Sequence, residues 1–311
     1  MTNNSTTKII VIGKSGQLAW ELSQLITPEH TIVCLGRDDV NVQDIPALVN
    51  CFRQYNAVVV INASAYTAVD KAESDVDNAF ALNANAVGNL AHACKTVSVP
   101  FVHISTDFVF HGDKGTPYLP GDDINPLGVY GASKAQGEHL IIDIYPEHSA
   151  IIRTSWVYST HGNNFVKTVL NLIASKPELG VISDQIGTPT YAKGLAQACI
   201  ASLTNQVVGV HHYTDTGVAS WFDFAVAIQN IGVELGLIDK KIPIKPITTA
   251  QYPTPAKRPH YSVLDKSSLV NALPELSLMH WQQQLTHMMT EVNNDIEESY
   301  KYIINSNIND K

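Results

Sequence analysis

The sequence predicts an α/β fold, in which a doubly wound parallel sheet carries a smaller C-terminal α/β lobe. Short apolar runs at residues 8–12, 57–62 and 101–105 have the β-branched composition of strands that are buried on both faces. Segments with helical patterns separate these runs, and such βαβ alternation is typical of parallel sheets. The alternation loosens after about residue 158, where shorter and more mixed elements begin.

The composition is that of an ordinary globular protein, with 45% hydrophobic and 16% charged residues among 311. A chain of this length can bury one large α/β domain and a smaller lobe. The net charge of −9 argues against nucleic-acid binding, which needs a basic surface. No apolar run is long enough to cross a bilayer, and residues 1–7 lack the apolar core of a signal peptide. We therefore expect no nucleic-acid partner and no membrane.

The cysteines are scattered along the chain without the spacing of a metal site: Cys34, Cys51, Cys94 and Cys199. Free thiols of this kind are typical of a reducing compartment, so we expect a cytoplasmic location. The acidic net charge does not attract anionic substrates, so any anion site must be built locally.

The first expected strand runs directly into a glycine-rich turn, Gly13-Lys-Ser-Gly16-Gln17-Leu18-Ala19, which a helical pattern follows. In a Rossmann fold, one glycine allows the tight turn and a second lets the backbone approach a pyrophosphate. The helix N-terminus then presents free N–H groups to the phosphates. Ala19, at the third position, still allows close helix packing. A purely structural turn is the alternative, but its place after the first strand favours a dinucleotide site.

The second expected strand, at residues 31–35, ends in Gly36-Arg37-Asp38. An NAD-preferring site usually has an acidic residue at this strand end, where it bonds the ribose hydroxyls. Here Gly36 opens space and Arg37 is able to face a 2′-phosphate. We therefore expect NADPH to be used at least as well as NADH. A solvated loop cation at Arg37 is equally compatible with the sequence.

The remaining elements follow in order along the chain. A crossover helix is expected at 44–55, and the strand at 57–62 ends in small residues that let the chain pass beneath a cofactor. Later elements are a helix at about 74–98, a loop at 112–126, strands at 150–153 and 179–182, and a helix at 192–203. Ligands of doubly wound sheets bind at the carboxyl ends of the strands, where the sequence places Gly16, Ala65, Thr106 and Tyr130.

Tyr130 and Lys134 begin the helix that is expected after the 112–126 loop, and positions four residues apart share one helix face. An ammonium about 4 Å from a phenol, at an effective dielectric of about 20, is worth roughly 3 pKa units. Such a contact would lower the pKa of Tyr130 toward neutrality, and Thr106 would add a hydroxyl to the same reacting oxygen. These groups form a proton-delivery set for a carbonyl or carbinol. An isolated motif of this kind is more often a solvated helix face, and the dinucleotide site is what favours catalysis.

Motifs in a recognisable order span nearly the whole chain, at residues 13–18, 62–73, 105–110, 130–134, 153–158, 162–165, 184–190 and 253–259. With these motifs the chain resembles the dTDP-4-dehydrorhamnose reductases, a family of extended short-chain dehydrogenases/reductases. The late motifs lie outside the cofactor half, so the resemblance is specific to this family.

The resemblance implies reduction of the C4 ketone of dTDP-4-dehydro-β-L-rhamnose by NADPH or NADH, which gives dTDP-β-L-rhamnose, a polysaccharide precursor. It implies that Tyr130 protonates the developing alkoxide and that Lys134 lowers the pKa of Tyr130 and holds the nicotinamide ribose. The substrate residues are then Thr106, Asp107, Trp156, Asn164 and Arg258. With the positions named above, the cofactor set is Gly13, Gly16, Gln17, Leu18, Arg37, Asn41, Val42, Ala65, Tyr66, Thr67, Tyr130 and Lys134. Without the resemblance, Trp156 would be read as a core aromatic and Arg258 as a solvated loop residue.

The chain departs from the family pattern at three places, one of which is the Gly36-Arg37 strand end, where the acidic residue is missing. Phe108 stands where members often have Tyr, so a phenol contact to the substrate is missing. Some relatives hold magnesium with glutamates at a dimer interface, and Glu21 matches one such position. Lys193 stands where another glutamate is expected. We therefore expect no tightly bound metal, and the resemblance leaves a homodimer open.

The expected domains are a dinucleotide-binding domain at 1–158, completed by returning segments of the later chain, a mainly nucleotide-sugar-binding lobe at 159–298, and a polar tail at 299–311. One alternative function is a non-catalytic regulatory subunit of the methionine adenosyltransferase beta type, which would not need Thr106, Tyr130 and Lys134. Another is a reductase of a different dTDP-4-keto-6-deoxy sugar. A dehydratase would need a pair of carboxylates beside Thr106, which Asp107 alone does not supply.

Overall fold

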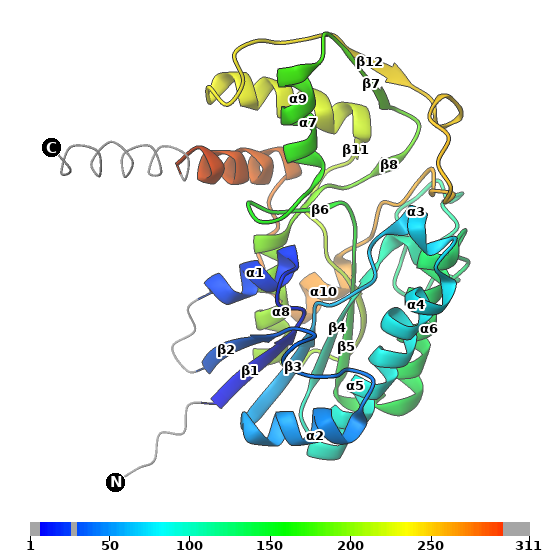
Figure 1. The fold of residues 1–311 in the computed structure, drawn as a ribbon, viewed down its shortest axis with the longest axis vertical. Coiled ribbons are helices and arrows are strands. Elements are labelled where there is room, and N and C mark those ends of the chain that lie inside the picture. Colours follow the sequence, from blue (N-terminus) through cyan, green and yellow to red (C-terminus); the bar gives the residue numbers. More distant parts are fainter. Residues whose placement is uncertain (1–6, 26–29, 295–311) are drawn as a thin grey trace, which may run out of the picture.

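The computed structural model describes residues 7–25 and 30–294, and the polar tail expected at 299–311 lies outside them. Within these residues the expected α/β class is confirmed. A central parallel sheet is covered by helices on both faces and occupies the lower half of the molecule in Figure 1. A second group of helices and short strands forms the upper half (Figure 1).

The central sheet has six parallel strands in the order β10-β5-β4-β3-β1-β2. Their bounds are β1 (Thr7–Ile12), β2 (His30–Leu35), β3 (Ala57–Asn62), β4 (Phe101–Thr106), β5 (Ser149–Thr154) and β10 (Gly209–His212). The strand order reverses between β1 and β3, because the chain first moves outward to β2 and then returns. A crevice for ligands opens at such a switch point, outside the carboxyl ends of the strands.

Alternate residues of each central strand enter two different cores. In β1, Ile10 and Ile12 pack with the helices α2 (Ile45–Gln54), α5 (Ala86–Val97) and α6 (Val129–Ile144). Ile9 and Val11 pack on the opposite face with α1 (Gln17–Gln24), α8 (Ala192–Thr204) and α10 (Ser267–Ala272). This two-sided burial explains why the strands read as continuous apolar runs and not as an alternating pattern.

The helix expected at about 74–98 is present but contains a π-helical turn. It consists of α4 (Val76–Phe80), η1 (Ala81–Asn85) and α5, after the short helix α3 (Val69–Ala72). The π turn presents Asn83 to α6, where a Cβ on Gly137 would lie only 2.2 Å from the Asn83 carbonyl oxygen. The glycine therefore allows the two helices to touch at this point.

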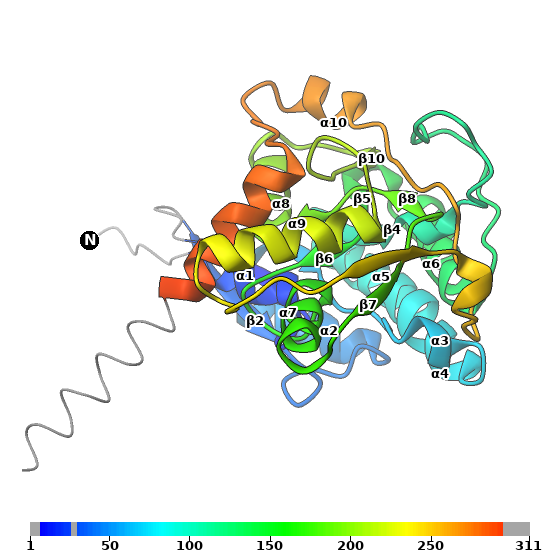
Figure 2. The same cartoon turned by 90° about the horizontal axis from the view of Figure 1, so that it is seen from above.

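After β5 the chain builds part of the upper half, returns to the sheet with α8 and β10, and then completes the upper half. The upper half contains α7 (Phe165–Ser175) and α9 (Trp221–Glu234), and three strand pairs: β6 (Val157–Tyr158) with β9 (Thr190–Tyr191), β7 (Leu179–Ile182) with β12 (Ile244–Ile247), and β8 (Ile186–Gly187) with β11 (Ala219–Ser220). A further helix over residues 281–294 packs against α9 through Trp281 and Leu285, and Figure 2 shows the two side by side. No described helix is both long and apolar enough to cross a lipid bilayer.

Candidate active site

The predicted site lies where β1, β3, β4 and β5 end. Gly13 follows β1 with a φ of +119°, and a Cβ there would lie 2.9 Å from the backbone of Ala63 and Ser64. Glycine alone tolerates both this φ and this close approach. The turns after β1 and β3 therefore lie in direct contact at the switch point of the sheet.

Helix α6 carries Tyr130 and Lys134 to the end of β4. Its N-terminus is capped from another segment, because the Glu73 carboxylate accepts a hydrogen bond of 2.9 Å from the Val129 N–H. A carboxylate is favourable there, since the helix dipole is positive at this end. A Cβ on Gly131 would lie 2.1 Å from the carbonyl oxygen of Phe108, so the glycine lets α6 press against the turn after β4.

The Tyr130 phenol lies beside Thr106 and Asp107, as predicted. The Tyr130 ring also packs edge-on against Phe108, with ring centroids 5.5 Å apart. Burial raises the pKa of Tyr130 to about 12, a hydrogen bond with the Thr106 side chain opposes this, and the Asp107 charge raises it further. The phenol is therefore a protonated group in the free protein, which is the state required of a proton donor.

Lys134 is buried and points toward β4. Its Nζ donates a 2.6 Å hydrogen bond to the Ile104 carbonyl and lies 3.1 Å from His103 Nε2. Burial lowers the pKa of Lys134 to about 8, which the nearby Glu138 charge partly offsets. The expected lowering of the Tyr130 pKa by Lys134 is wrong for the free protein, because the contacts of the amine are made with β4 and burial dominates at the phenol.

Asp107 is a buried carboxylate next to the reacting groups, with only 2% of its surface exposed. Thr106 Oγ1 donates to its Oδ1 at 3.0 Å and accepts the Phe108 N–H at 3.2 Å. Burial raises the pKa of Asp107 to about 6. Thr106 is thus held in one orientation between the carboxylate and the turn that follows β4.

The glycine-rich turn has the geometry of a pyrophosphate site. Gly16 precedes α1 and supplies no side-chain cap, so the N–H groups of the first turn, which includes Leu18, are free to bind an anion. Gln17 reaches across the site: its Oε1 accepts a 3.1 Å hydrogen bond from Asn164 Nδ2. Asn164 also donates to the Ser159 carbonyl at 2.7 Å and caps α7. Asn164, predicted to bind substrate, therefore connects the cofactor turn to the upper half.

Two exposed basic side chains lie near the end of β2: Arg37 follows the strand, and Lys14 comes from the turn after β1. Lys14 pairs with Asp39 at 3.2 Å, and Asp39 also accepts the Gly36 N–H at 2.8 Å. Hydrogen bonding to Gly36 and to Lys14 lowers the pKa of the Asp39 carboxyl. The predicted 2′-phosphate position thus has a second cation, Lys14, which sequence reasoning did not identify.

Two further residues that were predicted to bind the cofactor lie close to this strand end. Asn41 is exposed, and its Oδ1 accepts the Gln43 N–H at 3.0 Å. The Val42 carbonyl accepts a 3.1 Å hydrogen bond from Asn89, and the Val42 side chain packs on the core. Both residues follow β2, on the side where an adenine would lie in a Rossmann site.

The segment Ala65-Tyr66-Thr67 is held by Asn83. The Asn83 side chain accepts the Tyr66 N–H at 2.8 Å and donates to the Tyr66 carbonyl at 3.2 Å and to Ser133 Oγ at 3.0 Å. The Tyr66 hydroxyl donates to Asp75. The backbone beneath the expected cofactor is therefore tied to α6 by one asparagine.

Trp156 has a left-handed backbone, with a φ of +48°, which is uncommon for a residue that is not glycine. Its ring stacks on Trp221 with centroids 3.6 Å apart. A Cβ on Gly187 would lie 2.7 Å from the Trp156 ring, so glycine is needed beside it. One face of the indole is thus covered by Trp221, and the predicted sugar platform has its orientation fixed by neighbours.

Arg258 forms a two-pronged ion pair with Asp70, with 3.0 Å and 2.8 Å between nitrogen and oxygen atoms. The guanidinium also donates to the Ala256 carbonyl. The structure therefore places the Arg258 side chain against α3, at the edge of the cofactor half.

Lys193, which stands where the family pattern has a glutamate for magnesium, puts a positive charge at that position. Lys193 pairs with Glu291 at 2.7 Å, and Glu291 also accepts from Tyr191. Glu21 is buried and accepts a 2.6 Å hydrogen bond from Ser159. Residues 7–25 and 30–294 contain no group of three or more acidic, histidine or cysteine side chains arranged to hold a metal ion.

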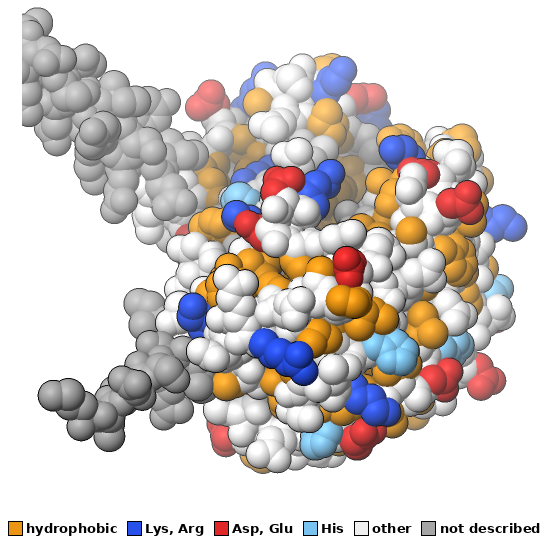
Figure 3. Space-filling model, turned by 60° about the horizontal axis from the view of Figure 1, so that its bottom comes forward, with side chains coloured by type: hydrophobic (Ala, Val, Ile, Leu, Met, Phe, Trp, Pro, Cys, Tyr) orange, Lys and Arg blue, Asp and Glu red, His pale blue; other side chains and the backbone are white. Residues whose placement is uncertain are grey.

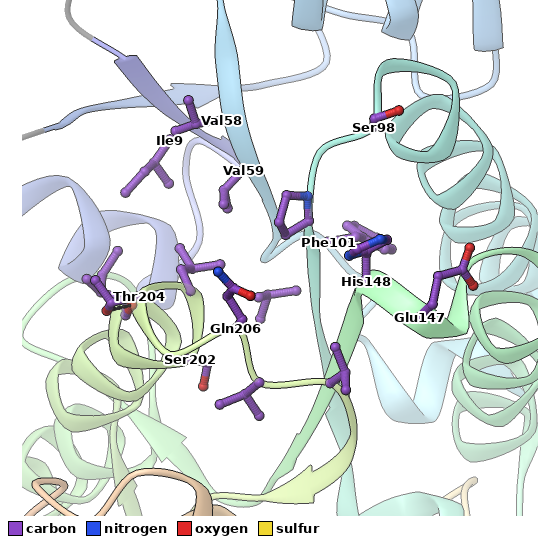
Figure 4. Close-up of a pocket in the computed structure, with 16 residues that line it drawn as sticks. Ile9, Val58, Val59, Ser98, Phe101, Glu147, His148, Ser202, Thr204 and Gln206 are labelled. Carbon is purple, nitrogen blue, oxygen red and sulfur yellow. Dashed lines mark hydrogen bonds between the residues drawn. The ribbon is translucent and has the colours of Figure 1, made fainter.

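A cavity of about 600 Å³ lies at the amino ends of the strands, which is the opposite end from these groups. Figure 4 shows Ile9, Val59 and Phe101, near the starts of β1, β3 and β4, together with Ser202 and Gln206. Since ligands of such folds bind at the carboxyl ends of strands, this cavity is not the predicted site. Figure 3 brings the lower side of the molecule forward, and acidic and basic side chains are interspersed on that face.

Sequence reasoning missed several residues that hold the site together: Asn62, Glu73, Asn83, His103 and Lys14. Most of them lie within or beside the motifs at residues 62–73 and 105–110, so motif membership was the available signal. What could not be read from the sequence is the partner of each side chain, since every partner lies on a different element.

A parallel sheet with a glycine-rich turn at its switch point, and with a Tyr-x-x-x-Lys helix against the end of β4, defines a protein of the short-chain dehydrogenase/reductase class. The model of the RmlD substrate binding domain family matches residues 7–294. The chain belongs to this family of dTDP-4-dehydrorhamnose reductases, as the resemblance indicated.

Individual relatives agree with this family. The spore coat polysaccharide biosynthesis protein SpsK of Bacillus subtilis is 37% identical, over 92% of this chain and 98% of its own. The dTDP-4-dehydrorhamnose reductase of Aggregatibacter actinomycetemcomitans is 36% identical, over 90% and 98%. The crystal structure of the Bacillus anthracis dTDP-4-dehydrorhamnose reductase in complex with NADP has a TM-score of 0.85 at 32% identity, covering 91% of this chain and 99% of that one.

Proposed function

We propose that the protein reduces the C4 ketone of dTDP-4-dehydro-β-L-rhamnose to dTDP-β-L-rhamnose, with NADPH or NADH as the reductant. The observation that carries the proposal is the convergence of the Tyr130 phenol, the Thr106 hydroxyl and the buried Asp107 carboxylate at the carboxyl end of β4. Family membership and the NADP complex of a relative support the choice of substrate and cofactor.

In this proposal the turn at Gly13 and Gly16 and the first turn of α1 hold the pyrophosphate, while Arg37 and Lys14 face a 2′-phosphate. A pyrophosphate fits here because no side chain covers the backbone at Gly16. The only atom near a Cβ built on Gly16 is the Ala63 carbonyl oxygen, at 3.9 Å. When bound, the reduced nicotinamide supplies a hydride.

The residues of the chain supply the proton and the orientation. Tyr130 donates its hydroxyl proton to the C4 oxygen as the carbonyl becomes a carbinol, and the phenolate then regains a proton from solvent. Thr106 orients the same oxygen by donating to it the single hydroxyl proton that Asp107 accepts in the free protein. Trp156 would pack on the sugar through the face that Trp221 leaves open, with Arg258 toward the diphosphate.

The test is turnover of dTDP-4-dehydrorhamnose by the purified protein with NADPH or NADH, with the sugar product identified by NMR. We expect oxidation of the cofactor to match formation of dTDP-rhamnose, and loss of both in Tyr130→Phe. Turnover of another dTDP-4-keto-6-deoxy sugar at a higher kcat/KM would reassign the substrate. Binding of nucleotide without any turnover would favour the regulatory-subunit alternative.

Three further expectations stay proposals. We divide the chain into a dinucleotide domain, which β10 completes, and a nucleotide-sugar lobe in the upper half. A homodimer would be detected by light scattering on the purified protein. A cytoplasmic location is supported by four cysteines that are free in the described structure.

A further inference from the structure

A line of buried polar groups runs from the end of β3 to Lys134. It passes from Ser64 through Asn62 and His103, with Asn62 1% exposed and His103 fully buried. Asn62 Nδ2 lies 3.0 Å from His103 Nδ1, and His103 Nε2 lies 3.1 Å from Lys134 Nζ. Each side chain contacts the next within hydrogen-bond distance, so the position of every proton in the line is constrained.

The orientation of the Asn62 amide is fixed by a backbone group. The Ser64 N–H can only donate, and it points at Asn62 Oδ1 at 3.1 Å. The Ser64 hydroxyl donates to the same oxygen at 2.7 Å. The amide nitrogen of Asn62, which can only donate, must therefore face His103 Nδ1.

His103 then has one compatible tautomer. Burial is the largest cause that lowers the pKa of His103 well below its usual range, so the ring is neutral and carries one N–H. Because Nδ1 accepts from Asn62, the proton must be on Nε2. That N–H points at Lys134 Nζ, and a charged ammonium has no lone pair with which to accept it.

We propose that Asn62 holds His103 in the Nε2–H tautomer, so that His103 donates to Lys134 Nζ and favours the neutral amine of Lys134 in the free protein. A neutral amine can accept from His103 and still donate to the Ile104 carbonyl, which satisfies every contact of the line. His103 is thus a positioning residue, which sets the pH at which the ammonium of Lys134 forms. This inference concerns the lysine that the sequence pairs with Tyr130, and its kinetic test rests on the proposed function.

Other charged groups face Lys134 from the elements packed around it. On α6, Glu138 favours the ammonium, but Glu138 is itself paired with Arg153 of β5 at 2.6 Å. From the end of β4, Asp107 is buried and its pKa is raised to about 6, and Tyr130 on α6 stays protonated. Burial lowers the pKa of Lys134 to about 8, in the same direction as the His103 donor.

The direct test is NMR of the full-length free protein labelled with ¹⁵N-histidine. Two-bond ¹H–¹⁵N correlation spectra distinguish the two neutral tautomers from imidazolium, and the His103→Gln variant assigns the signals by their loss. We expect the Nε2–H pattern for His103 at pH 9, where Lys134 with its pKa of about 8 is neutral, and no imidazolium between pH 5 and 9. An Nδ1–H pattern, or a titration of His103 near its ordinary pKa, would overturn the proposal. This readout needs no turnover, so it is decided even where the proposed activity fails.

The second test is the pH dependence of kcat/KM, which reports groups of the free enzyme. In His103→Gln the amide oxygen can face Lys134, so the alkaline limb should move up by about one pH unit. Asn62→Ala, which removes the donor to Nδ1, should move it in the same direction, and thermal melts would verify that both variants fold. His148→Gln, at an exposed histidine near the amino ends of the strands, is the control. It should change neither the His103 NMR pattern nor the alkaline limb. An unchanged limb in both folded test variants would reject the coupling.

Discussion

Arg258 and Asp70 form a two-pronged ion pair between residues that are 188 positions apart in the chain. Asp70 belongs to α3, near the end of β3, and Arg258 to the proline-rich loop at residues 253–259. Hydrogen bonding to the guanidinium lowers the pKa of the Asp70 carboxyl. A paired Arg258 has a fixed position at the site, and a planar guanidinium is well suited to bind a diphosphate with its remaining donors.

The ion pair predicts a shared effect of Asp70→Asn and Arg258→Lys. Each should raise KM for the dTDP-sugar by about tenfold with a smaller change in kcat, because orientation of the substrate is lost and the proton donor is intact. Steady-state kinetics of the single and double variants measures the coupling. Additive effects in the double variant would show that the two residues act separately.

Tyr130→Phe should reduce kcat by about 10²-fold or more, since it removes the proton donor and retains the ring. NADPH binding, followed by fluorescence, should change little, because the phenol is only one of many cofactor contacts. Tyr55→Phe, which removes a hydroxyl at the C-terminal end of α2 and away from the site, is the matched control and should turn over normally. Near-normal turnover by Tyr130→Phe would remove this residue from the mechanism.

Asp107→Asn should stabilise the protein at pH 7.5. Since burial raises the pKa of Asp107 to about 6, the folded state binds more protons than the unfolded state between about pH 4 and 6. Stability therefore falls as the pH rises through this window, and the buried carboxylate costs on the order of 3 kcal/mol above it.

Chemical denaturation of wild type and Asp107→Asn at pH 7.5 and pH 4 measures this effect. The difference in unfolding free energy should be present at pH 7.5 and should vanish near pH 4. The same substitution should reduce turnover, because Thr106 loses its charged acceptor. A variant that is less stable than wild type at both pH values would contradict the prediction.

Arg37→Ala should lower kcat/KM for NADPH by about tenfold and leave the value for NADH nearly unchanged, because only NADPH carries the 2′-phosphate. Lys14→Ala should act in the same direction, since its ammonium lies at the same strand end. Arg53→Ala, which removes an exposed cation of α2, is the control for net charge. Equal losses with both cofactors would show that Arg37 does not read the 2′-phosphate.

Gly187→Ala should displace Trp156, because the new Cβ would lie 2.7 Å from the indole. We expect a raised KM for the dTDP-sugar and a changed tryptophan circular dichroism signal from the disturbed Trp156–Trp221 stack. At Gly121 an added Cβ meets no atom within 4 Å, so Gly121→Ala is the control. An unchanged spectrum and KM in Gly187→Ala would exclude Trp156 as a constrained platform.

Much of the fold could be predicted because strands buried on both faces leave a direct signal in the sequence. The run at 57–62 coincides with β3, and the helix expected at 44–55 is α2 within one residue at each end. The π turn at Asn83 was not predictable, because it depends on packing against Gly137 of a distant helix. At the site, the residue types were recognised, but the attachment of Lys134 to His103 and Ile104 was not. The four-residue spacing of Tyr130 and Lys134 predicts that both side chains project from the same face of the helix. The contacts of each side chain depend on how deeply that face is buried, which the spacing does not show.

The last strand of the central sheet, β10, is made only after the segments that form much of the upper half. A ribosome synthesising this protein therefore releases β5 long before residues 209–212 that pair with it. During that interval the nascent chain has an unpaired β5 edge, which invites pairing with other chains. A fragment that ends near residue 158 lacks β10, so the β5 edge of its sheet would stay unpaired. We therefore expect this fragment to aggregate when it is expressed alone.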